Sequence, residues 1–151
     1  MDKSMTESDT VKENTSGQYA IVNGLKIYYE VHGDGEPLIL LHGGVGASEM
    51  FEPMLPALAK NRKVISVHLQ AHGHTSDTNR PLRFESMADD IAGLLKHLDL
   101  EQADILGYSL GGGVALQTAI RHPDIVHKLI LVSFPFSGTG FTRRSWRAWH
   151  R

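Results

Sequence analysis

A serine flanked by glycines is the feature that most constrains how this chain can fold. An apolar run ends at Gly107-Tyr108-Ser109-Leu110-Gly111, and residues with helical spacing follow it. Gly107 and Gly111 remove the side chains that would clash where a strand turns sharply into a helix. Such a turn lifts the serine hydroxyl to the mouth of a cleft, at a helix amino terminus that favours negative charge. The pattern predicts that Ser109 is a nucleophile and that the Leu110 N–H faces a developing oxyanion. The alternative is a glycine-rich turn without chemical function.

The rest of the chain alternates between short apolar runs and segments with helical spacing. Asn23-Gly24 separates the first two β-rich runs, and this dipeptide strongly favours a two-residue hairpin turn. The later apolar runs are typical of strands buried on both faces of a parallel sheet. The expected strands are 18–22, 25–31, 37–41, 63–69, 103–106 and 128–132, and the expected helical segments are 48–60, 84–98 and 110–122. The sequence therefore predicts an α/β fold, with a doubly wound, mostly parallel sheet that begins with an antiparallel hairpin and ends after a sixth strand.

A second glycine-rich segment follows the third expected strand. His42-Gly43-Gly44 would let backbone N–H groups approach a ligand closely. We expect the Gly44 N–H to be the second oxyanion donor, with a plain flexible turn as the alternative. His42 could be taken for a catalytic base, but its place at a strand end ahead of the serine turn favours a structural role beneath the loop.

Two other clusters of polar residues allow competing interpretations. His68, His72 and His74 could form a metal site, but the chain lacks thiolates and offers only Asp77 nearby, so we favour a loop without metal. Asp89-Asp90 lies on the clearest amphipathic segment, where we expect both carboxylates on the solvated face.

In its ordered motifs, the chain resembles the N-terminal half of α/β-hydrolase-fold serine hydrolases, within the esterase and lactonase group. The motifs are His42-Gly43-Gly44, His72-Gly73 and the glycine-flanked Ser109 turn. The resemblance implies Ser109 as nucleophile, oxyanion donors at Gly44 and Leu110, a small carbonyl substrate such as an ester or lactone, and no cofactor or metal. His42, Gly43, Gly107 and Gly111 would support the turns.

The chain departs from the family pattern at two places. Members often carry Asp-x-Arg-Gly-His-Gly after the fourth strand, where this sequence has His68, Gln70 and Ala71, so the usual ion pairing of that loop is not expected. The family triad also requires an acid and a histidine on later strands.

The chain offers few candidates for those two triad members. After Ser109 the only side-chain carboxylate is Asp124, and the histidines are His122, His127 and His150. None follows a plausible later strand, so we expect the acid and histidine of the triad to be missing from this chain. A catalytically inactive fragment or a ligand-binding remnant of the fold is the alternative.

Composition excludes several other functions. The absence of cysteine excludes disulfides and thiol chemistry, and a net charge of −2 argues against nucleic-acid binding. No apolar run reaches membrane-spanning length, and no hydrophobic signal core is present, so we expect a cytoplasmic protein that does not enter membranes.

We expect three segments along the chain. Residues 1–16 are polar and aperiodic, as in a disordered leader, and 17–133 form a partial hydrolase core. Residues 134–151 form an aberrant basic tail, for which a shifted reading frame is one explanation and a basic aromatic patch for nucleic acid or membrane is another. An unpaired sixth strand would leave an exposed sheet edge through which the chain could self-associate.

Overall fold

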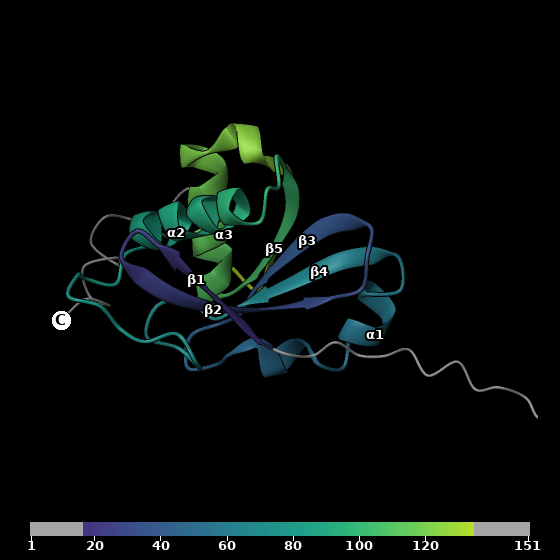
Figure 1. The fold of residues 1–151 in the computed structure, drawn as a ribbon, viewed down its shortest axis with the longest axis horizontal. Helices are drawn as coiled ribbons and strands as arrows, with labels where there is room; N and C mark the ends of the chain where they lie inside the picture. Colours follow the sequence, from purple (N-terminus) through teal and green to yellow (C-terminus); the bar gives the residue numbers. More distant parts are fainter. Residues whose placement is uncertain (1–16, 135–151) are drawn as a thin grey trace, which may run out of the picture.

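The computed structural model describes residues 17–134, so the expectations for 1–16 and 135–151 lie outside the described residues. Six strands form one sheet in the order β1-β2-β4-β3-β5-β6 (Figure 1). The strands are β1 (Gln18–Val22), β2 (Leu25–His32), β3 (Glu36–Leu41), β4 (Arg62–Val67), β5 (Ala103–Tyr108) and β6 (Val126–Val132). The helices are η1 (Ser48–Phe51), α1 (Leu55–Leu58), α2 (Phe84–His97), α3 (Leu110–Arg121) and η2 (Pro123–Ile125).

The pairing of the strands confirms the predicted hairpin and mostly parallel sheet. β1 and β2 are antiparallel around a turn in which Asn23 and Gly24 have φ of 50° and 77°. β2 also pairs antiparallel with β4, whereas β4, β3, β5 and β6 are mutually parallel. The carboxyl ends of the four parallel strands therefore meet at one end of the sheet, called here the carboxyl end, and their starts form the amino end.

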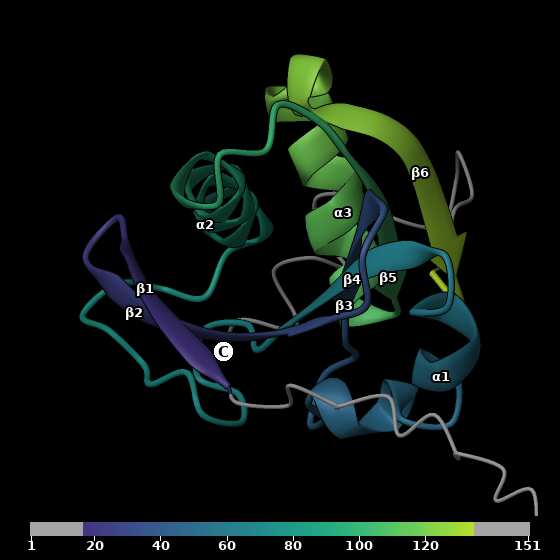
Figure 2. The same cartoon turned by 45° about the vertical axis from the view of Figure 1, so that its right-hand side comes forward.

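Alternate residues of the central strands face two separate cores. Ile39 and Leu41 of β3 pack into the core formed with α2 and α3, whereas Leu38 and Leu40 pack with Phe51 and α1 on the opposite face. Figures 1 and 2 show α2 and α3 together on one side of the sheet and α1 on the other. No helix within 17–134 is long and apolar enough to cross a bilayer.

The helical segment expected at 48–60 is broken in the structure. It forms a short 3₁₀ turn and a single α-helical turn, η1 and α1, with Pro53 between them and Pro56 inside the first turn of α1. Proline has no backbone N–H to donate, and its ring clashes with the preceding turn, so a continuous helix cannot run through Pro53 and Pro56. Phe51 and Leu55 of this segment are buried, but its prolines limit the length of the helix.

The expectation that both carboxylates of α2 are solvated is wrong for Asp90. Its side chain is 2% exposed and accepts hydrogen bonds from Arg80 and, at 3.2 Å, from Asn23 Nδ2. Burial raises the pKa of Asp90, against the opposing effect of Arg80. Gln70, at the position where the family usually has arginine, accepts a 2.9 Å hydrogen bond from Arg80 Nε. Arg80 from the far end of the loop thus supplies an ion pair that the sequence did not predict.

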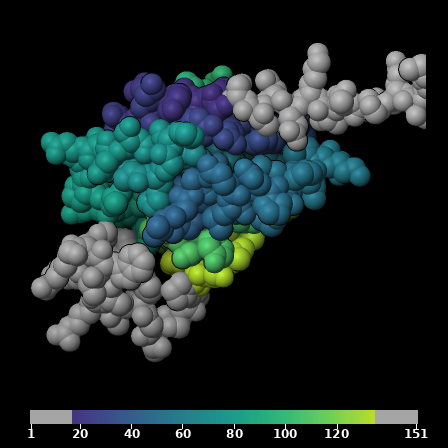
Figure 3. Space-filling view, turned by 90° about the horizontal axis from the view of Figure 1, so that it is seen from below, coloured from purple at the N-terminus to yellow at the C-terminus, as the bar shows by residue number. Residues whose placement is uncertain are grey.

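β6 is covered on one face only. Leu129 and Leu131 pack toward α3, whereas Ile130 and Val132 on the opposite face are each 40% exposed. In the space-filling view from below (Figure 3), yellow-green β6 remains visible beside the blue segment that carries η1 and α1. Within 17–134 no further strand pairs with its outer side.

Candidate active site

Ser109 lies at a sharp turn between β5 and α3. Its backbone has φ 49° and ψ −111°, in a region that residues with a side chain rarely occupy. A Cβ at Gly107 would lie 2.2 Å from the Gly111 carbonyl oxygen, and a Cβ at Gly111 would lie 2.2 Å from the Leu41 carbonyl oxygen. Both positions therefore require glycine, because the elbow passes directly against its own helix and against the end of β3.

The peptide groups around the serine leave donors unused. The Ser109 N–H donates to the Val132 carbonyl at 2.9 Å, which ties the elbow to the end of β6, and the Ser109 carbonyl accepts from the Gly112 N–H at 2.9 Å. The Leu110 N–H, at the start of α3, donates no hydrogen bond to any described residue. An N–H at the first turn of a helix is a favourable partner for an anion.

The glycine loop after β3 brings a second unused N–H to the elbow. A methyl group added at Gly44 would lie 3.9 Å from the Leu110 side chain, so the two residues are neighbours. The Gly43 N–H donates to Met50 Sδ at 3.4 Å, whereas the Gly44 N–H finds no partner within 17–134. Of the two glycines, only Gly44 retains a donor for a ligand in this arrangement.

His42 lies completely buried beneath this loop. Its Nε2 accepts the Leu69 N–H at 3.0 Å, so the proton of the neutral ring is on Nδ1, which donates to the Gly43 carbonyl at 2.7 Å. Burial lowers the pKa of His42 to about 4, although the Gly43 carbonyl opposes this shift. With both nitrogens occupied, His42 has no lone pair available to accept the Ser109 proton.

The histidines of the loop after β4 are also held by internal contacts. His68 is buried; its Nδ1 accepts the His74 N–H at 2.8 Å, and its Nε2 lies 2.7 Å from Ser48 Oγ. His72 Nδ1 lies 2.8 Å from the Gln70 carbonyl. No group of three or more His, Asp or Glu side chains in the described part of the chain is arranged to hold a metal ion.

Within 17–134 three histidines pair with carboxylates: His32 with Glu30 on β2, and the two histidines that follow Ser109 in sequence. The latter two pairs lie far from Ser109. His122 Nε2 is 2.7 Å from Asp89, and His127 Nδ1 is 2.8 Å from Asp104. His122 follows the 12 residues of α3, about 18 Å from the serine end of that helix. Asp104 is five residues before Ser109 on an extended strand, about 16 Å away. Neither imidazole can act as the base for this serine, and the sequence did not predict these pairs because both acids precede Ser109.

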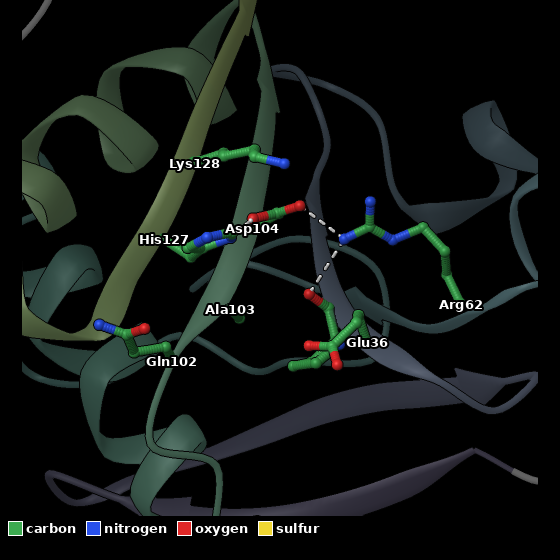
Figure 4. Close-up of a pocket in the computed structure, with 8 residues that line it drawn as sticks. Glu36, Arg62, Gln102, Ala103, Asp104, His127 and Lys128 are labelled. Atoms are coloured by element: carbon green, nitrogen blue, oxygen red, sulfur yellow. Dashed lines mark hydrogen bonds and ion pairs between the residues drawn. The ribbon is translucent and has the colours of Figure 1, made fainter.

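The Asp104 pair lines a hollow of about 280 Å³ at the amino end of the sheet. Arg62 reaches from β4 to within 2.6 Å of Asp104, and His127 approaches the same carboxylate from β6 (Figure 4). Burial alone would raise the pKa of Asp104, but hydrogen bonds from Arg62 and His127 outweigh it and hold that pKa below its ordinary value. The cluster ties together the starts of β4, β5 and β6.

Comparison of the sequence with known proteins identifies the family of this chain. A profile of the alpha/beta hydrolase fold matches residues 36–151, and the chain belongs to that family. Over 130 residues the chain is 36% identical to 2-hydroxymuconate semialdehyde hydrolase of Pseudomonas sp. strain CF600, covering 80% of this chain and 46% of that protein.

Two solved structures share this fold, and each is about twice as long as the part that matches this chain. An esterase from Exiguobacterium antarcticum, 33% identical, superposes with a TM-score of 0.73 over 77% of this chain and 44% of its own. The epoxide hydrolase CorEH, 28% identical, gives 0.77 over 85% and 47%. The chain thus spans just under half the length of each of these three relatives.

Proposed function

We propose that this chain carries the nucleophile half of a serine hydrolase that acts on a small ester, lactone or related carbonyl compound. The observation that supports this best is Ser109 at a strained elbow beside the N–H groups of Leu110 and Gly44, which have no partner among the described residues. In this mechanism Ser109 Oγ attacks the carbonyl carbon, and the two N–H groups stabilise the oxyanion. Collapse of the tetrahedral intermediate breaks the ester bond and expels the alcohol, which takes up a proton, and Ser109 is left acylated. Water then cleaves the acyl-enzyme, which releases the acid and restores the Ser109 hydroxyl.

The proton acceptor must come from sequence outside the described residues. His42 and His68 are occupied, and His122 and His127 lie at the other end of the sheet. Loss of the base typically lowers the rate by about 10⁴- to 10⁶-fold. By itself the described core would bind and orient a carbonyl group but turn it over very slowly, and a ligand-binding remnant of the fold is the second candidate.

The choice of a carbonyl substrate rests on the paired donors. Two N–H groups on neighbouring residues suit the single oxygen that gains charge when a nucleophile adds to a carbonyl carbon. Among the relatives, the names of the semialdehyde hydrolase and the esterase indicate carbonyl substrates, whereas the epoxide hydrolase acts on a strained ether. We therefore place the ester-like carbonyl first.

A fluorophosphonate probe tests the proposal, because it reacts with activated serines. We expect slow labelling confined to Ser109, about 10⁴-fold below the rate of a complete hydrolase, and its loss in Ser109→Ala. Ser133→Ala is the matched control, since Ser133 is exposed and also has positive φ, 51°, but is not predicted to face an oxyanion pocket. Labelling spread over several serines, or none at Ser109, would contradict the nucleophile. Ordinary turnover of aryl esters that Ser109→Ala abolishes would contradict the missing base.

A further inference from the structure

The orientation of a single peptide group decides whether the glycine loop can offer a donor. The Gly43 carbonyl and the Gly44 N–H belong to the same peptide, which is trans, so they point in opposite directions. The carbonyl points at the buried His42 ring, to which it is hydrogen-bonded at 2.7 Å. The Gly44 N–H must therefore point away from that ring, on the loop that contacts Leu110.

No other hydrogen bond from a residue within 17–134 holds this peptide. Two consecutive glycines can rotate the plane between them at little steric cost, and a half-turn would present a carbonyl oxygen where the N–H now lies. Met50 holds only the preceding peptide, through the Gly43 N–H. We propose that His42 is a positioning residue, whose Nδ1–H selects the peptide orientation that aims the Gly44 N–H at the substrate oxygen; this inference rests on the proposed hydrolase function.

The selection works only with one form of the ring. Nε2 must remain unprotonated to accept the Leu69 N–H, which obliges Nδ1 to carry the proton. The titratable groups that face the ring are His72 and His68 from the loop after β4 and Glu49 from η1. Complete burial of the ring and the two imidazoles disfavour a second proton, while Glu49 favours it weakly.

Two amide variants separate the two hydrogen bonds of His42. In His42→Asn, the amide nitrogen can take the place of Nδ1 and still donate to Gly43, but no atom reaches Leu69. In His42→Gln, the amide can accept the Leu69 N–H in place of Nε2, but nothing lies near the Gly43 carbonyl. Each variant loses one hydrogen bond and the ring, so a purely structural role would affect both alike.

The experiment follows backbone amides of the whole chain by ¹⁵N–¹H NMR during a titration with acetate, whose oxygen serves as a probe for the donor pair. For the unmodified chain and for His42→Asn we expect shifts at both Leu110 and Gly44. For His42→Gln we expect a shift at Leu110 only, with acetate binding weakened about tenfold or more. Equal behaviour of the two variants, whether both keep or both lose the Gly44 response, would overturn the positioning role while leaving the donor pair intact.

Two further results distinguish the possible failures. If neither amide of the unmodified chain responds to acetate, the proposed donor pair fails, and this inference fails with it. The ring of the unmodified chain gives an independent check that needs no variant to fold. Long-range ¹⁵N–¹H spectra should show a protonated Nδ1 and a bare Nε2 on His42, and the opposite tautomer would overturn the inference.

Discussion

The two ends of the sheet differ in the kinds of group that they carry. Acyl transfer by a serine requires a hydroxyl with N–H donors, found at one end, and a histidine–carboxylate pair, found at the other. The carboxyl end has Ser109, two N–H groups that no residue of 17–134 accepts, and the neutral, buried imidazoles of His42 and His68. The amino end has imidazoles paired with carboxylates, His127 with Asp104 and His122 with Asp89. About 16 Å of strand separates the two sets.

This difference shows that residue type alone does not make a catalytic site. A histidine can act on Ser109 only if it is close and has a ring nitrogen available. Both nitrogens of His42 and of His68 are hydrogen-bonded, whereas His122 and His127 are too far away. Burial keeps His42 and His68 at the carboxyl end uncharged, whereas ion pairs hold charge at the amino end. The two ends should therefore respond differently to pH and to mutation.

The largest expected effect is acid destabilisation that begins at the carboxyl end. The folded pKa of His42 is about 4, below its ordinary 6.5, so the unfolded chain binds more protons between these values. This contribution is complete above pH 6.5 and is lost as pH falls toward 4, amounting to about 3 kcal/mol. His68, whose pKa burial also lowers, acts in the same direction, while the raised pKa of Asp90 opposes them in the lower part of the range.

The amino end should lose stability in a different window. The pKa of Asp104 is held below 3.8, so its contribution is present above that value and is lost only as pH falls further. Urea unfolding at pH 7, 5.5 and 4.5 measures the stability change expected at the carboxyl end. His42→Asn should make the free energy of unfolding depend less on pH in this range. Constant stability from pH 7 to 4.5 would refute the contrast between the two ends.

A smaller effect is expected from neutralising the amino end. Asp104→Asn removes the partner of Arg62, whose Nε already lacks a hydrogen bond, and should cost about 2 kcal/mol. His127 is more than half exposed, so His127→Ala should cost less than about 1 kcal/mol. Urea unfolding gives both values. Fluorophosphonate labelling of Ser109 should be unchanged in both variants, and slower labelling would show that the ends are coupled.

The parts of this molecule that sequence predicts well depend on local rules. Strand alternation separates Leu38 from Ile39 onto opposite faces, and the elbow glycines follow from steric contact within a few residues. The missed features depend on partners that lie outside the periodic segment itself. Asp90 follows a helix pattern that would leave it solvated, yet Arg80 at the end of an aperiodic loop pairs with it in the interior. The roles of Ser109 and its two donors remain predictions.

The tautomer of His42 shows the same limit within the candidate site. Its position before the glycines is visible in the sequence, but its proton is fixed by the Leu69 N–H, from another strand end. No periodicity encodes that contact, because it depends on the relative placement of β3 and β4. The sequence therefore identifies the residues around the serine better than it identifies their protonation.

The smallest effect on stability, but the most direct test of surface exposure, concerns the two edge strands. Ile130 on β6 is exposed on the face that α1 leaves uncovered, and apolar edge strands favour association. We expect the chain to self-associate through β6, and Ile130→Lys to shift sedimentation toward monomer while changing the free energy of unfolding by only a few tenths of a kcal/mol. Ile21→Lys on β1, the opposite edge strand, is the matched control and should leave association unchanged.

Antiparallel pairing of two β6 strands would set the amino end of one molecule beside the carboxyl end of another. If Ser109 labelling rose with protein concentration and fell in Ile130→Lys, the amino end of one molecule would be acting on Ser109 of its neighbour.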